Sequence, residues 1–151
     1  MDLDREVERL AGRSVRAIFE DEGEARFRDL ESLALAQVLS GAAPVVVACG
    51  GGVLGRAANR ELLGSRARVV WLRVDPASAA ARLGESGASE RPLLGGALEE
   101  RLRSLLERRG PGYAEAANTA VETAGDPPEE IAGRIAELLS RSGDRWDPSA
   151  S

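Results

Sequence analysis

The triple glycine Gly50-Gly51-Gly52 is the stretch of the sequence best suited to bind a ligand. It follows residues 45–48, whose small and β-branched side chains without polar alternation predict a strand buried on both faces. Glycine leaves no side chain in the way of a ligand, and open α/β sheets bind ligands at the carboxyl ends of their strands. We therefore expect a binding site at this turn.

The same glycines allow a second interpretation. Gly50, Gly52 and Gly55 have the G-x-G-x-x-G spacing of a dinucleotide-binding turn, and Asp75 ends the next expected strand, where such folds carry a ribose-binding acid. This alternative makes the chain an NAD-binding Rossmann-type domain. However, only one further weak strand follows and a helical block precedes the glycines, whereas a mononucleotide-binding half needs more βα units.

Charged residues elsewhere could act on phosphates or hydroxyl groups. Asp2 and Asp4 could accept a proton and help to hold Mg²⁺, or they could simply compensate a helix dipole. Arg91, in a glycine-flanked loop, could close over phosphates or lie in solvent. Arg109 precedes Gly110 at an expected helix C-terminus, where compensation of the helix dipole is the simpler explanation.

Composition narrows the class of protein. The 151 residues carry a net charge of −5, which argues against a general nucleic-acid or membrane-surface role. No apolar run approaches membrane-spanning length, the N-terminus is charged, and the single cysteine allows no internal disulfide, so we expect a cytoplasmic protein. Histidine and lysine are absent, and all 20 basic residues are arginine, so this sequence contains neither a histidine base nor a P-loop lysine.

Periodicity predicts an α/β protein. Helices are expected from Asp2 to near Gly12 and over residues 15–19, 24–39, 55–63, 77–83, 98–109 and 127–139, and strands over 45–48, 69–74 and 119–123. Gly23 is expected to separate the second and third helices. Arg28 and Glu31, three residues apart, are predicted to form a surface ion pair. Residues 142–151 are expected to be a disordered tail.

In this order the motifs resemble those of the shikimate kinase family. Six groups match over residues 1–139: Asp2-x-Asp4; Gly12-Arg13-Ser14-Val15 with Ile18-Phe19; Gly23-Glu24 with Phe27-Arg28-x-x-Glu31; Gly50-Gly51-Gly52; Arg91-Pro92-Leu93-Leu94; and Arg109-x-Pro111-x-Tyr113. Six ordered matches are far more specific than any one of them. The resemblance implies one domain over residues 1–141 with a lid loop at 84–97. Its implied fold is a three-layer α/β/α sandwich with a parallel sheet, similar to P-loop nucleoside-monophosphate kinases but without the first two strands.

The resemblance also implies an activity, namely transfer of the ATP γ-phosphoryl group to a hydroxyl of shikimate in aromatic amino-acid biosynthesis. Implied ligands of shikimate are Asp4, Arg28, Gly50, Gly51, Gly52 and Arg109. Asp4 would also accept the reacting proton, Arg91 would cover the phosphates, Asp2 would approach Mg²⁺ through water, and Arg82 would pack on the nucleotide base. The implied protein is monomeric when complete and binds neither nucleic acid nor membrane.

The sequence departs from the family's pattern at its start. Family members carry a strand, a G-x-x-x-x-G-K-[ST] loop, a helix and a second strand before the paired aspartates, and their first strand lies between those that match residues 45–48 and 69–74. We therefore expect these two strands to face a gap, so that the chain as written folds poorly or associates through that edge and phosphorylates shikimate negligibly. Three accounts compete: a shikimate kinase written from an internal methionine or cut short, a shortened homologue that binds shikimate or a partner without catalysis, and the dinucleotide-binding domain.

Overall fold

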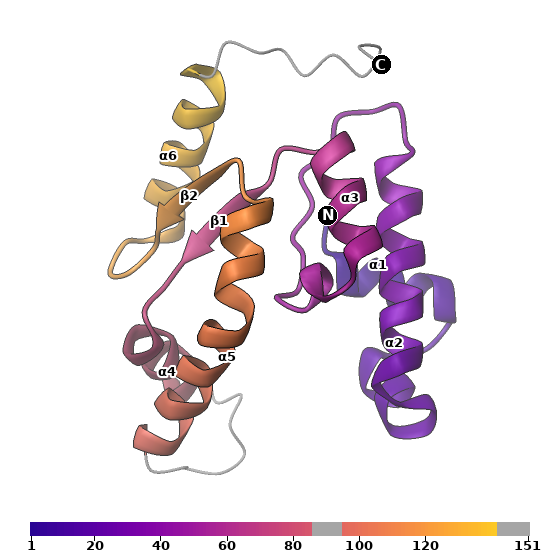
Figure 1. Cartoon of the computed structure of the whole chain (residues 1–151), viewed down its shortest axis with the longest axis horizontal. Coiled ribbons are helices and arrows are strands. Elements are labelled where there is room, and N and C mark those ends of the chain that lie inside the picture. Colours follow the sequence, from indigo (N-terminus) through magenta and orange to yellow (C-terminus); the bar gives the residue numbers. More distant parts are fainter. Residues whose placement is uncertain (86–94, 142–151) are drawn as a thin grey trace. The chain divides into compact units, whose positions relative to one another are not determined.

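The computed structural model describes residues 1–85 and 95–141, which divide between Ala67 and Arg68 into two compact units (Figure 1). The first unit contains α1 (Leu3–Ala11), α2 (Val15–Leu39), the single 3₁₀ turn η1 (Val53–Gly55) and α3 (Ala57–Arg66). The second contains β1 (Val70–Arg73), α4 (Pro76–Glu85), α5 (Gly95–Ala116), β2 (Thr119–Glu122) and α6 (Pro128–Arg141). Both ends of the expected lid segment 84–97 are thus helical, and Arg91 and residues 142–151 lie outside the described residues.

Short-range chemistry sets the ends of the first two helices. Asp2 caps α1 by accepting a hydrogen bond from the Asp4 amide at 2.9 Å, and Ser14 caps α2 by accepting one from Ala17 at 3.2 Å. Gly12 ends α1 in the left-handed conformation with φ of 67°. The predicted separation at Gly23 is confirmed, because its φ of 81° and ψ of 177° break the helical path inside α2.

The core of the first unit lies between α1 and α2. Its buried apolar side chains are Leu3, Val7, Ile18, Phe27, Leu30, Ala34, Leu35, Val53 and Leu63. Phe19 is partly exposed, and its ring centroid lies 4.7 Å from that of the buried Phe27. The apolar stripe of α2 therefore holds this unit together.

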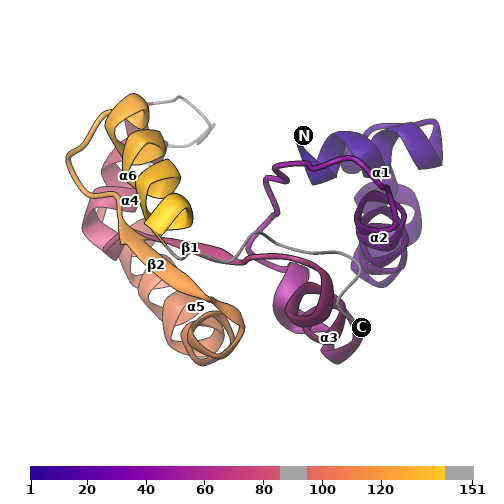
Figure 2. The same ribbon diagram turned by 90° about the horizontal axis from the view of Figure 1, so that it is seen from above.

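The second unit is built on two parallel strands, as predicted. β1 pairs with β2 from Val70 opposite Thr119 to Arg73 opposite Glu122. Figure 2 shows α5 and α6 on opposite sides of these strands. Trp71 of β1 contacts Tyr113 of α5 with ring centroids 5.5 Å apart, so an aromatic pair fastens α5 to the sheet.

The expectation of a buried strand at residues 45–48 is wrong. These residues form a single β-bridge, between Ala48 and Asp2, and Val46 is 85% exposed. The bridge consists of two hydrogen bonds, from Leu3 N to the Ala48 carbonyl at 3.0 Å and from Ala48 N to the Met1 carbonyl at 2.8 Å. A strand needs a partner along its length. Within the described residues, 45–48 have only this bridge and a hydrogen bond from the Met1 ammonium to the Val46 carbonyl at 2.7 Å.

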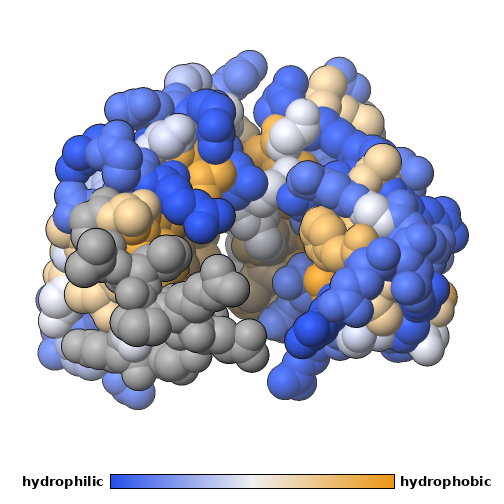
Figure 3. Space-filling model, turned by 90° about the horizontal axis from the view of Figure 1, so that it is seen from below, coloured by the Kyte–Doolittle hydropathy of each residue, from blue (hydrophilic) through white to orange (hydrophobic). Residues whose placement is uncertain are grey.

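Helix α6 has no fully buried residue. Leu138 and Leu139 are each 38% exposed. A two-stranded sheet is too narrow to cover the whole apolar stripe of a helix. Figure 3 shows, on one face, apolar residues in orange among hydrophilic ones in blue. Large apolar side chains of both units are exposed. They are Met1, Phe19, Leu33, Val45, Val46, Leu72, Leu83, Leu106, Leu138 and Leu139.

None of the helices in the described ranges is long and apolar enough to cross a membrane. Poor folding or association through the exposed edge remains a prediction.

We predict that Gly23→Ala destabilises the chain by about 1–3 kcal/mol, because its backbone conformation is accessible almost only to glycine. The free energy of unfolding is measured by urea titration followed by far-ultraviolet circular dichroism. Gly64→Ala is the matched control, since Gly64 is exposed inside α3 with open space around its Cα and should gain about 0.5–1 kcal/mol. Equal effects of the two substitutions would contradict the assignment of strain to Gly23.

Candidate functional site

Arg28 of α2 reaches the glycine turn and lies against its backbone. A Cβ atom on Gly52 would stand 2.6 Å from the guanidinium carbon Cζ, so residue 52 must be glycine for the guanidinium to keep this position. The ring of Phe27 supports the same guanidinium, with Cζ 5.1 Å from the ring centroid. The turn and the helix together therefore fix a cation where the sequence predicted a binding site.

Glu31 anchors one edge of this guanidinium. Arg28 Nη1 donates to Glu31 Oε1 at 3.0 Å and to Oε2 at 2.9 Å, and the Glu31 side chain is only 1% exposed. The prediction of a surface ion pair is thus wrong. Helical spacing indicated that Glu31 is buried, because it lies four residues after Phe27 and three before Ala34, on the buried face of α2.

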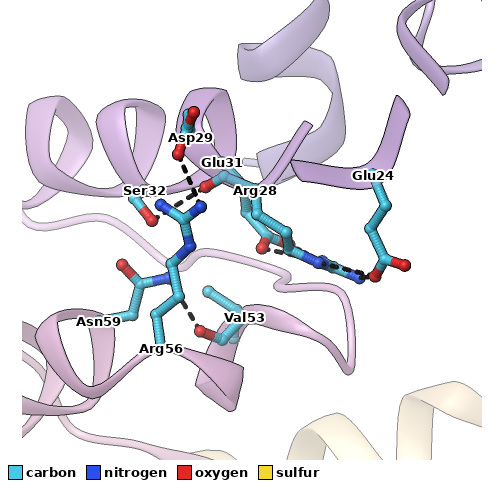
Figure 4. Close-up of polar contacts among 8 residues, drawn as sticks. All are labelled: Glu24, Arg28, Asp29, Glu31, Ser32, Val53, Arg56 and Asn59. Carbon is cyan, nitrogen blue, oxygen red and sulfur yellow. Dashed lines mark hydrogen bonds and ion pairs between the residues drawn. The ribbon is translucent and has the colours of Figure 1, made fainter. Parts of the chain in front are cut away.

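Glu24 engages the other edge of the guanidinium. Its Oε1 accepts from Arg28 Nε at 3.3 Å and from Nη2 at 3.1 Å (Figure 4). Desolvation lowers the pKa of Arg28. The hydrogen bonds that Arg28 donates to Glu31 and Glu24, with the charges of these carboxylates, outweigh desolvation and raise that pKa above its ordinary value. The guanidinium is therefore a permanent positive charge.

Asp4, from α1, faces the same turn. A Cβ on Gly50 would lie 3.9 Å from Asp4 Oδ1 and 3.8 Å from Glu31 Oε1, so both carboxylates border the space beside that glycine. Desolvation, followed by the negative charges of Asp2 and Glu8, raises the pKa of Asp4, although Arg28 opposes the shift. A carboxylate with a raised pKa takes up a proton more readily, which suits it to accept one from a hydroxyl group.

Two residues near the start of α3 also support the glycine turn, and nothing in the sequence indicated them. Asn59 of α3 is buried and donates from Nδ2 to the Val53 carbonyl at 2.8 Å. Arg56 Nη2 donates to Asp29 Oδ1 at 2.6 Å, which joins the start of α3 to α2 (Figure 4). A single asparagine or an isolated charge pair carries no sequence signal for such support.

Cys49 stands immediately before the glycines. Desolvation of the thiol, with smaller contributions from the charges of Glu31 and Asp4, raises its pKa to about 11. The residue is exposed overall, but its thiol remains protonated near neutral pH and is a poor nucleophile there.

Two expected site residues belong to the second unit. Arg109 lies in the interior of α5, seven residues before its end, so compensation of a helix dipole does not explain it. It lines a cleft of about 570 Å³ beside Trp71, Leu102 and Tyr113. Arg82 of α4 donates to the carbonyl of Thr123 at the end of β2.

The ribose-binding role considered for Asp75 finds no support. Its carboxylate accepts a hydrogen bond from Ser78 N at 2.9 Å at the start of α4, and this bond and that of the Ser78 hydroxyl hold its pKa below the ordinary value. Asp75 therefore serves to begin a helix.

Among the described residues, no three His, Cys, Asp or Glu side chains cluster as a metal site.

Comparison with known proteins gives a consistent result. A family model described as shikimate kinase matches residues 1–140. Shikimate kinase of Thermobifida fusca (strain YX) is 42% identical over 144 residues, which are 95% of this chain and 81% of that protein. The enzyme of Salinispora arenicola (strain CNS-205) is 42% identical over 139 residues, with coverages of 92% and 81%.

Solved structures agree. The structure of shikimate kinase from Acinetobacter baumannii in complex with shikimate matches with a TM-score of 0.82 and 36% identity, over 94% of this chain and 78% of that one. Shikimate kinase from Bacteroides thetaiotaomicron matches with a TM-score of 0.80 and 29% identity, over 93% and 82%. The expected three-layer α/β/α fold class is thereby confirmed.

Glu31→Gln should lower the free energy of unfolding by about 1–3 kcal/mol, because it removes the buried counter-ion of Arg28. Glu20→Gln is the control on the same helix. Its ion pair with Arg16 is exposed, so the change should stay within about 0.5 kcal/mol. Urea titration of both variants measures the free energy of unfolding. Similar decreases in the two variants would show that burial adds nothing to the Arg28–Glu31 pair.

The raised pKa of Cys49 predicts slow alkylation. At pH 8 iodoacetamide should modify the folded chain about ten-fold more slowly than the urea-unfolded chain, because less thiolate is present and its greater nucleophilicity compensates only in part. The rate in the folded chain should rise as the pH passes through about 11. The single cysteine makes the readout by mass spectrometry unambiguous, and identical pH profiles for the two states would refute the shift.

Proposed function

Because the chain belongs to the shikimate kinase family, we propose that its glycine turn, with Arg28 and Asp4, binds the acceptor in an ATP-dependent phosphoryl transfer to a hydroxyl of shikimate. Members of this family are ATP-dependent phosphotransferases of the shikimate pathway, which leads to the aromatic amino acids. One observation carries the proposal. A fixed guanidinium and a carboxylate of raised pKa face the same side-chain-free turn.

Each residue of the turn has a chemical task in this proposal. Arg28 binds the carboxylate of shikimate, for which a planar guanidinium is the best-matched side chain. Asp4 accepts hydrogen bonds from the ring hydroxyls and takes the proton of the reacting one. Gly50, Gly51 and Gly52 leave room for the ring to approach the backbone.

The roles proposed for Arg109 and Arg82, both in the second unit, are those that the family resemblance implies. Arg109 is proposed as a further ligand of the shikimate carboxylate, and Arg82 as a residue that packs on the nucleotide base. Arg91, outside the described residues, is proposed to cover the phosphates. In phosphoryl transfer most of the rate comes from such positioning and from stabilisation of charge.

Mg²⁺ fits the acidic end of the site only in part. One oxygen of Asp2 accepts a hydrogen bond from the Asp4 amide, and no cluster of three acidic ligands occurs within residues 1–85 and 95–141. Mg²⁺ keeps several waters and uses one or two carboxylates together with substrate phosphates. We therefore propose that Asp2 approaches the ion through water. Bound Mg²⁺ would neutralise charge on the phosphates.

The donor side of the reaction needs groups that these 151 residues do not contain. The sequence has no lysine and no G-x-x-x-x-G-K-[ST] loop to surround the ATP phosphates. We propose that this stretch by itself binds the acceptor but does not transfer the phosphoryl group. A cytoplasmic location, a monomeric complete protein and the absence of nucleic-acid partners are part of the same proposal.

The binding role is tested by isothermal titration calorimetry with shikimate. Arg28→Gln should weaken binding about ten- to a hundred-fold, because a charge-assisted hydrogen-bonding partner is lost. Arg16→Gln, on the same helix in an exposed pair, should bind like the unmodified chain. Saturable binding of NAD with no binding of shikimate would instead support the dinucleotide-binding alternative. Shikimate-dependent release of ADP by the pure 151-residue chain would contradict the proposal that this stretch binds the acceptor without transferring the phosphoryl group.

A further inference from the structure

The guanidinium of Arg28 has two edges with very different partners. Nη1 points to Glu31, whose side chain is 1% exposed, whereas Nε and Nη2 point to Glu24, whose side chain is 67% exposed. The Nε–Nη2 edge is a parallel pair of donors, which can hold both oxygens of a carboxylate at once. In this structure a single oxygen, Glu24 Oε1, accepts from both donors at 3.3 and 3.1 Å.

Of the two partners of Arg28, only Glu24 can be separated from it at a small cost in free energy. Breaking the bond to Glu31 leaves a buried carboxylate without its counter-ion, which is strongly unfavourable. Breaking the bond to Glu24 releases an exposed carboxylate into water, and exposed ion pairs contribute little. A ligand's carboxylate that replaces Glu24 would also improve the geometry, from one shared acceptor to two.

We propose that Glu24 occupies the edge of Arg28 that receives the acceptor's carboxylate, and that the acceptor displaces it on binding. The identity of the acceptor rests on the function proposed above, but the displacement itself requires only that Arg28 binds a carboxylate. Glu24 then acts as an internal competitor. It lowers the apparent affinity in proportion to its occupancy and disfavours ligands that lack a carboxylate to replace it.

A simple charge effect must be separated from displacement. Any negative charge near Arg28 weakens the binding of an anion, whether or not it occupies the same donors. Glu24→Asp keeps the charge but shortens the side chain by one methylene group, so the carboxylate no longer reaches both Nε and Nη2. Glu24→Gln keeps the length but removes the charge. Displacement predicts that both variants bind more tightly, whereas a charge effect predicts this for glutamine alone.

The first experiment is calorimetric titration of shikimate into the unmodified chain, Glu24→Gln, Glu24→Asp and the control Glu20→Gln. Both substitutions at residue 24 should lower the Kd about two- to five-fold, and Glu20→Gln should leave it unchanged. An unchanged Kd at residue 24, tighter binding in Glu24→Gln alone, or weaker binding in both variants would overturn the proposal. The last outcome would mean that Glu24 positions Arg28 instead of competing at it.

The second experiment does not depend on shikimate. The Nε–Hε resonance of Arg28, assigned by its loss in Arg28→Lys, is followed by nuclear magnetic resonance during titration with sodium acetate. It should respond at lower acetate concentration in Glu24→Gln and Glu24→Asp than in the unmodified chain and Glu20→Gln. Equal responses in all four proteins would overturn the inference. The expected acetate response without any binding of shikimate would refute the proposed function and leave the inference standing.

Discussion

The arrangement of the glycine turn against α2 depends on one charged pair, Arg28 and Glu31. Glu31 lies on the apolar face of α2, where a lone carboxylate would be strongly unfavourable, and Arg28 makes that position possible with two hydrogen bonds. Because Arg28 must stay beside Glu31, its guanidinium crosses the backbone of Gly52 and fixes how the turn sits on the helix. A structural requirement and a binding requirement thus meet in one side chain, and the cation is in place before any ligand arrives.

Features that depend on neighbouring residues could be predicted from the sequence. Gly23 acts within one or two helical turns, so its role as a break in the helix followed from residue type and position. The order of six short motifs carried the family assignment, because no single motif is specific enough. The second unit's two strands were also predicted, the first from the apolar residues before Asp75 and the second from a weaker pattern at 119–123.

Features that depend on distant partners could not be predicted. Residues 45–48 have the composition of a central strand, but pairing depends on the adjacent backbone. Within the described residues, that backbone is the short segment at residues 1–3, which bonds to Val46 and Ala48. Gly110, Pro111 and Gly112 predict the end of a helix, yet α5 continues to Ala116. Near that end Tyr113 makes a tilted ring contact with Trp71 of β1, an interaction that local preference does not include. The supporting contact of Asn59 likewise follows only from the path of the turn above it.

The contact between Gly52 and Arg28 links two positions that are far apart in the chain. Any side chain at residue 52 would displace the guanidinium, so a substitution there also moves the cation that Arg28 supplies. The two positions are therefore coupled. The effect of a substitution at residue 52 depends on which side chain residue 28 carries, so the two substitutions should not act additively.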